Sequence, residues 1–147
     1  MENKKIWIWV GVVVVVLGVV ASFFLPHNNG SSPAPIYAAK GQLTPQFPRS
    51  LILHALSGVT DSYAIPYNAS TNQYTAQFDS SSSVDFIYND YLQYFISSGW
   101  HIMNTIRSGD SRGLYASTST GEASVAIEPL TIGSNTASRV TIGYLTK

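Results

Sequence analysis

The sequence predicts an α+β protein in which an N-terminal transmembrane helix precedes a two-layer domain, with one helix packed on an antiparallel sheet in the order β-β-α-β-β-β-β. Three observations support this prediction. Residues 6–25 carry no charge, residues 84–95 repeat apolar side chains at helical spacing, and the other regular segments alternate apolar and polar residues between turns. One helix packed across one sheet buries the apolar faces of all these segments in a single core.

Residues 6–25 form the predicted membrane helix. A helix of this length, rising about 1.5 Å per residue, matches a hydrocarbon core about 30 Å thick. Lys4 and Lys5 precede the segment, and the next cation after it is Lys40. The positive-inside rule therefore keeps residues 1–5 in the cytoplasm and places the C-terminal domain outside, with the lipid bilayer as the first expected partner.

Two features of this segment have alternative interpretations. A signal peptidase would find small residues before a cut after Ala21, although apolar residues continue through Leu25 without a polar break. Gly11, Gly18 and Ser22 fall on one helix face, where small side chains let a neighbouring membrane helix pack closely. Glycine is also common in membrane helices in general, so this face has a second explanation.

Residues 26–46 are rich in Pro, Gly, Ser and Asn and contain few large apolar side chains. Such a composition predicts a flexible tether, because it cannot build a core of its own. As a coil it averages about 25 Å end to end. The domain at residues 47–147, and any partner of that domain, are therefore expected close to the membrane surface.

Two strands open the domain. Apolar and polar side chains alternate over residues 63–67, where Pro66 indicates an edge position or an irregular strand. Residues 68–72 predict a turn, and residues 74–79 alternate again. The two segments are expected to pair as a hairpin.

Residues 84–95 predict the single helix of the domain. Its apolar side chains recur at intervals of three and four residues and form one stripe facing the sheet: Val84, Ile87, Tyr88, Tyr91, Leu92 and Phe95. Ser82 is placed to cap the N-terminus, with Asp85 three residues later as in a capping box. Gly99 can adopt the left-handed conformation that ends a helix, and Trp100 starts the next strand.

Three residues of this helix, Phe86, Asp90 and Tyr94, form an outward stripe that the core does not explain. We expect this stripe to contact a partner. Single exposed aromatic residues are also ordinary on soluble proteins, so the stripe has a purely structural alternative.

The C-terminal part of the domain predicts four strands in an antiparallel meander. They are separated by turn sequences rich in Gly, Ser, Asp and Asn. The expected strands are residues 100–106, 114–120, 123–128 and 139–145.

The boundaries of these elements resemble a known kind of protein. A membrane helix and a Pro/Ser-rich tether are followed by a Phe47-Pro48 start, a helix beginning at Ser83-Val84 and ending in Gly99-Trp100, and a Ser/Thr-rich meander. This arrangement is similar to the small, single-pass, membrane-anchored extracytoplasmic α+β domains of unknown function in bacteria and archaea. Those domains often have a Tyr-Pro-Gly-Ala-like entry where this chain has residues 54–58. The resemblance implies no catalytic residues.

Composition excludes several classes of function. Charged residues make up 11% of the 147 residues, and residues 47–147 contain five basic and seven acidic side chains, a net charge of −2. A domain of this charge lacks the basic surface that binds nucleic acid. The chain has no cysteine, which excludes disulfides, thiolate metal sites and a cysteine nucleophile.

The sequence offers no catalytic or metal-binding motif. His27, His54 and His101 are scattered, and a metal site would need distant groups to converge. Asp85 and Asp90 are five residues apart, so they project from different helix faces and form no carboxylate pair. The patterns of serine hydrolases, P-loops and dinucleotide-binding proteins are absent from the sequence.

Two predicted turns contain residues that suggest further binding or modification sites. Residues 107–113 gather two arginines, an aspartate and two glycines, which suits a hairpin turn and, alternatively, an anion site on backbone amides. Asn68 begins an Asn-Ala-Ser glycosylation sequence.

These observations predict a non-enzymatic, membrane-anchored accessory or docking subunit of a membrane protein complex, with no cofactor. The domain outside the membrane is expected to make the contact with the partner. The alternative is a cell-envelope polymer or glycan binding module that stacks exposed Tyr and Phe rings on sugars.

Overall fold

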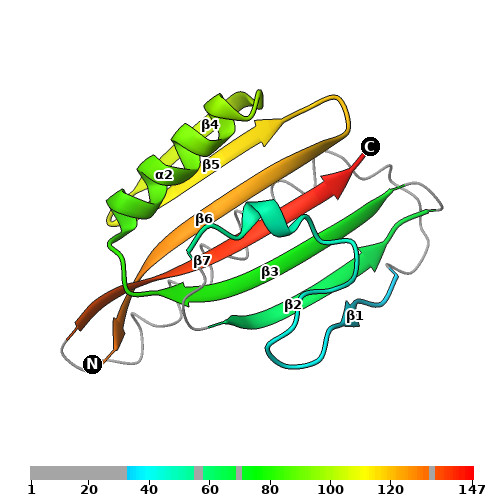
Figure 1. The fold of residues 1–147 in the computed structure, drawn as a ribbon, viewed down its shortest axis with the longest axis horizontal. Coiled ribbons are helices and arrows are strands. Elements are labelled where there is room, and N and C mark those ends of the chain that lie inside the picture. The colour runs from blue at the N-terminus through cyan, green and yellow to red at the C-terminus, as the bar shows by residue number, and fades with distance from the viewer. Residues whose placement is uncertain (1–32, 55–57, 69–70, 133–134) are drawn as a thin grey trace. The chain divides into compact units, whose positions relative to one another are not determined.

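The computed structural model describes residues 33–54, 58–68, 71–132 and 135–147, all within the unit Pro33–Lys147 (Figure 1). Within these ranges, no helix has both the length and the apolar character needed to cross a membrane. The predicted membrane helix at residues 6–25, with Gly11, Gly18 and Ser22, lies outside the described residues.

The described chain forms one antiparallel sheet of seven strands with one α-helix packed on it (Figure 1). The strand order is β1-β2-β3-β7-β6-β5-β4. The α+β class, the N-terminal hairpin and the C-terminal meander are therefore confirmed, and β1 is an additional strand. The strands are β1 Ile36–Tyr37, β2 Val59–Pro66, β3 Asn72–Ser80, β4 His101–Ser108, β5 Ser111–Ser117, β6 Gly121–Ile132 and β7 Asn135–Thr146.

The helix α2, Val84–Ser97, begins one residue later than the predicted cap implies. Ser83, and not Ser82, is the N-cap, because its hydroxyl accepts a hydrogen bond from the Phe86 N–H at 3.3 Å. The backbone of Ser82 is held elsewhere, since its carbonyl accepts a 2.7 Å hydrogen bond from the Ser138 hydroxyl on β7. This contact ties the start of the helix to the sheet.

Gly99 takes the predicted conformation at the end of α2, whereas β4 begins at His101, one residue after the predicted start at Trp100. Gly99 has a φ of +77°, in the left-handed region. The Trp100 N–H then donates to the Phe95 carbonyl at 2.8 Å, which closes the last turn before β4.

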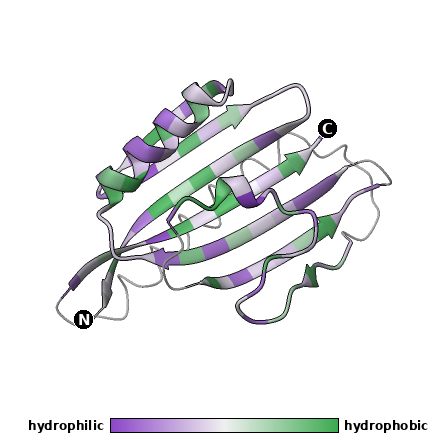
Figure 2. Ribbon diagram, viewed as in Figure 1, coloured by the Kyte–Doolittle hydropathy of each residue, from purple (hydrophilic) through white to green (hydrophobic). Residues whose placement is uncertain are grey.

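One face of α2 and one face of the sheet form the core. The predicted stripe on α2 is confirmed: Val84, Ile87, Tyr88, Tyr91 and Phe95 are buried, and Leu92 is half-buried against them. Apolar and polar residues alternate along the strands, as Figure 2 shows, because successive side chains point to opposite faces. The sheet contributes Tyr74, Ala76, Phe78, Leu114, Ala116, Ala123, Val125, Ile127, Val140 and Ile142.

A second segment covers the same face beside the helix. It contains the short 3-10 helix η1, Arg49–Leu51, which lies in front of the sheet next to α2 in Figure 1. Phe47 and Leu51 are buried in the core cluster. The Tyr91 hydroxyl donates a 2.7 Å hydrogen bond to the Leu51 carbonyl, so the segment is joined directly to the helix.

Residues 33–46, which the composition assigns to the tether, are part of the fold. Ile36 of β1 lies opposite Ala64 of β2. Thr44 is buried, and its N–H donates to the Ser62 hydroxyl at 3.1 Å. The folded unit therefore begins well before Phe47. Backbone pairing and hydroxyl contacts hold this segment, and neither produces a periodic apolar pattern in the sequence.

Replacing Ser62 with alanine tests whether this segment is held as described. The buried Ser62 hydroxyl accepts from the Thr44 N–H and donates to the Thr75 carbonyl at 3.0 Å. Its loss leaves buried polar groups unpaired, so we expect the free energy of unfolding to fall by about 1–3 kcal/mol. Urea unfolding measures this change. The control is Thr60→Ala, because Thr60 is exposed and donates to the Gln77 carbonyl at the surface; we expect about 0.5 kcal/mol or less there.

Candidate functional site

The outer face of α2 carries a cluster that combines two of the predicted contact residues with a histidine. His54 Nε2 lies 2.8 Å from Asp90 Oδ2. The His54 ring also meets the Phe86 ring edge-on, with 5.7 Å between ring centroids. We call His54, Phe86 and Asp90 the His54 patch.

Tyr94, the third predicted contact residue, does not belong to this patch. It is half-buried and packs against the core, with its ring centroid 5.7 Å from that of Phe95. Four residues past Asp90, the helix has turned its side chain about 40° further toward the sheet. The predicted stripe is therefore shortened to Phe86 and Asp90.

The segment before His54 is anchored firmly. Leu51 is fully buried, and its carbonyl accepts the hydrogen bond from Tyr91. These contacts fix the chain three residues before His54 and bring the imidazole over α2. Sequence reasoning treated His54 as an isolated histidine, and no spacing rule links it to Asp90, because the two residues belong to separate segments.

The His54 patch offers both apolar area and polar groups to a partner. The Phe86 side chain remains 52% exposed although it contacts His54. The side chains of His54 and Asp90 are 22% and 40% exposed, although the His54 Nε2 atom that lies against Asp90 is itself buried. An aromatic ring bordered by hydrogen-bonding side chains is typical of residues that anchor protein interfaces.

The N-terminal half of α2 contacts two arginines that flank the β4–β5 turn, Arg107 on β4 and Arg112 on β5. Arg112 Nε lies 3.0 Å from Asp85 Oδ1, and the Arg107 guanidinium lies 5.7 Å from the centroid of the Tyr88 ring. Gly109, with a φ of +56°, begins the two-residue turn. The hairpin interpretation of this loop is confirmed, and both arginines bind the helix.

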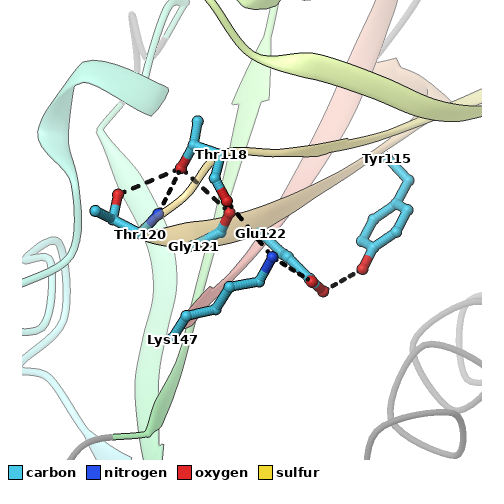
Figure 3. Close-up of polar contacts among 6 residues, drawn as sticks. All are labelled: Tyr115, Thr118, Thr120, Gly121, Glu122 and Lys147. Carbon is cyan, nitrogen blue, oxygen red and sulfur yellow. Dashed lines mark hydrogen bonds and ion pairs between the residues drawn. The ribbon is translucent and has the colours of Figure 1, made fainter.

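Polar side chains around the turn between β5 and β6 form a second cluster (Figure 3). The Tyr115 hydroxyl donates to the Glu122 carboxylate, and Lys147 Nζ lies 2.9 Å from Glu122 Oε1. Lys147 Nζ also donates to the Thr118 carbonyl at 3.5 Å. Partial burial, followed by the hydrogen bond to Glu122, raises the pKa of Tyr115. These groups satisfy one another and fasten the end of β7 to the hairpin.

A third surface feature lies on β1 and β2. Tyr37 is 63% exposed, and its ring centroid lies 5.4 Å from that of Tyr63, its neighbour across the strands. Tyr67 follows just after the same strand and donates to Gln73 Oε1 at 3.0 Å. We call Tyr37, Tyr63 and Tyr67 the tyrosine strip.

The other residues that the sequence analysis singled out lie apart from these three clusters or outside the described residues. Asn68 is exposed in the β2–β3 turn, where its side-chain oxygen accepts from the Thr71 N–H at 2.8 Å. His101 is exposed at the start of β4. Within the part of the chain that the structure describes, no group of three His, Asp or Glu side chains is arranged to hold a metal ion. His27 lies outside that part.

Comparisons of the chain with protein-family models, with curated proteins and with solved structures found no match. Functional proposals for this chain therefore rest on the geometry of its described residues. Of the three clusters, the His54 patch and the tyrosine strip keep ring surface open to solvent, whereas the Tyr115–Glu122–Lys147 cluster is closed on itself.

Proposed function

We propose that the chain is a non-enzymatic accessory or docking subunit of a membrane protein complex, and that it acts through its folded domain. In this proposal residues 6–25 span the bilayer, residues 1–5 face the cytoplasm and the domain lies outside. The observation that carries the proposal is the His54 patch, where a half-exposed phenylalanine lies beside the partly exposed side chains of His54 and Asp90.

Rigidity of the patch supports a docking role. Phe86 and Asp90 lie on a regular helix, and His54 follows a buried anchor at Leu51. Side chains already held in place lose less conformational entropy when a partner binds. The patch is therefore prepared for contact before the partner arrives.

The length of chain before the domain supports a partner at the membrane. The folded unit begins at Pro33, so only residues 26–32 separate it from the proposed membrane helix. Seven residues span at most about 25 Å. A partner that the domain reaches is therefore close to the bilayer. The resemblance to small membrane-anchored extracytoplasmic domains agrees with this arrangement.

The tyrosine strip favours a second candidate function, binding of a cell-envelope polymer or glycan. Exposed tyrosine rings stack on sugar rings, and their hydroxyls donate hydrogen bonds. Tyr37 and Tyr63 supply adjacent rings, and the Gln73 amide lies beside Tyr67. This surface involves none of the residues of the His54 patch, so the two functions are separable by mutation.

Replacing Phe86 with alanine tests the docking proposal. We expect recovery of a stoichiometric membrane partner, after mild detergent solubilisation and affinity purification of the full chain, to fall at least about tenfold, because losing an interface anchor costs about 1.4 kcal/mol or more. The free energy of unfolding is expected to change by about 0.5 kcal/mol or less. Tyr37→Ala is the matched control, since it removes another exposed aromatic ring, from the tyrosine strip.

A photo-crosslinking residue at position 86, compared with one at the exposed position 60, locates the contact in intact cells. The docking proposal expects one defined membrane protein joined to position 86 and none to position 60. It is wrong if the chain is purified without a stoichiometric partner and binds isolated envelope polymer in a manner that Tyr37→Ala abolishes. That second result supports the alternative.

A further inference from the structure

Strand β4 forms one outer edge of the described sheet. β4 is the last strand in the sheet order, and no described strand pairs with its outer side. Seven of its eight residues are exposed, including Met103 and Ile106 at 54% and 38%. Natural edge strands are commonly protected by lysine, proline or inward-pointing charge. β4 contains no Lys or Pro; its one Arg, Arg107, lies over the Tyr88 ring of α2, and its irregularity is confined to the N-terminal part, between Ile102 and Asn104.

Hairpin geometry identifies which backbone groups point outward. Gly109 and Asp110 connect β4 to β5, and Ser108 and Ser111 form the first pair. In a two-residue hairpin the first pair exchanges both hydrogen bonds, and the orientation then alternates along the strand. The N–H and C=O groups of Thr105 therefore point away from β5, as do those of Arg107 two residues later.

A side-chain contact agrees with this assignment. The Thr105 N–H donates at 2.8 Å to Asn104 Oδ1, an exposed side-chain oxygen of the preceding residue. A backbone donor that bonds to its own neighbour is not bonded to β5. Because both groups are at the surface, exchanging this bond for a cross-strand bond has a small energetic cost.

We propose that two copies of the chain associate through β4, antiparallel about a two-fold axis at Ile106, so that one sheet continues into the other. On such an axis a residue lies opposite itself, and the outward groups of Thr105 bond to those of Arg107 in the second copy. This contact goes beyond the docking function and uses a different surface from the His54 patch.

The register of β4 selects this axis. Pairing with β5 shifts between Ile102 and Asn104, which leaves Asn104–Ser108 as the regular part of the strand. An axis at Ile106 pairs all five of these residues. An axis at Thr105 or Arg107 pairs only three, because it runs into the irregularity or into the turn.

Side chains across the proposed interface are compatible with a second copy. Ile106 meets Ile106, and their contact covers apolar surface that is exposed in one chain. Arg107 lies opposite Thr105, so no like charges face each other. If the anchor spans the bilayer as proposed, it confines copies to one plane and raises their effective concentration.

The absence of cysteine from the chain allows a direct test. In Ile106→Cys the two thiols lie opposite each other on the axis, in a pair whose Cα atoms are separated by about 4.5 Å, within the range that a disulfide bridges. We expect oxidation of membranes containing the full chain to yield a disulfide-linked dimer. Thr60→Cys is the matched control for random collisions, because it is an exposed strand position away from β4. Equal crosslinking of both variants overturns the proposal.

A second substitution, added to Ile106→Cys, tests the backbone contact. Proline at position 105 removes an N–H that points away from β5, so the Thr105→Pro chain keeps its hairpin bonds but loses two bonds to the second copy. We expect Thr105→Pro to reduce the disulfide crosslink at position 106 at least about tenfold while the circular dichroism spectrum is unchanged. Undiminished crosslinking with an intact spectrum overturns the β4 pairing. Loss of the dimer with retention of the membrane partner at the His54 patch separates this inference from the proposed function.

If Thr105→Pro alters the spectrum, Ile106→Lys replaces it, since this change places two like charges on the axis and leaves the backbone intact. Sedimentation of the full chain in detergent is then expected to change from dimer to monomer. A wild-type chain that sediments as a monomer at all concentrations, and whose Ile106→Cys variant does not crosslink in membranes, also overturns the proposal.

Discussion

Replacing Phe95 with alanine is expected to lower the free energy of unfolding by about 3–5 kcal/mol. Phe95 is fully buried between α2 and the sheet, and its ring contacts those of Tyr91, Tyr94 and Trp100. Its removal leaves a cavity that the neighbouring aromatic side chains can fill only in part. Chemical unfolding followed by circular dichroism measures the change.

Phe86→Ala is the matched control, because it removes the same side chain from the exposed face of the same helix. We expect a change of about 0.5 kcal/mol or less. Equal losses in the two variants would contradict the orientation of α2 on the sheet, and with it the exposure of the His54 patch.

Replacing Leu51 with alanine is expected to cost about 2–5 kcal/mol. Leu51 is fully buried, although it belongs to a three-residue helix outside the regular elements that the sequence predicts. The same unfolding measurement reports the loss. Ile36→Ala is the control, since Ile36 is 62% exposed on β1.

A change below about 1 kcal/mol in Leu51→Ala would mean that the segment before β2 adheres only weakly to the core, because truncating a well-packed leucine costs more. The position of His54 would then be loosely fixed. The docking proposal depends on that position, so this stability measurement also bears on function.

Most of the fold was predictable because its signals are local. The apolar stripe from Val84 to Phe95 repeats at the helical period, and the strand segments alternate with a period of two. Gly99 marks the end of the helix from its residue type alone. The error in the N-cap is one residue, because Ser82 and Ser83 are chemically equivalent neighbours and residue type alone does not distinguish them.

The parts that were missed depend on distant contacts. β1 has two residues, too few for any alternation, and Thr44 is held by a hydroxyl on β2. Nothing in the composition of residues 33–46 distinguishes them from a tether. The hydroxyl and backbone groups that fix them belong to another part of the chain.

The candidate site shows the same limit. Helical periodicity correctly placed Phe86 and Asp90 on the outer face of α2. It did not reveal His54, because a contact between side chains of separate segments has no fixed spacing in sequence. Tyr94 was assigned to the same face, but its position at the flank lets a large ring turn inward against Phe95.

The position of β7 has a consequence for the order of folding. β7 lies between β3 and β6 and joins the N-terminal hairpin to the rest of the sheet through eight residue pairs, reinforced by two hydrogen bonds from Arg139 to Asp79. It is also the last of the described strands in chain order. The β3–β7 pairs that join the two halves of the sheet therefore cannot form until residues 135–146 have been synthesised, and contacts of such long sequence separation form slowly. A chain that stops before β7 leaves one edge of β3 and one edge of β6 without the strand that pairs with them.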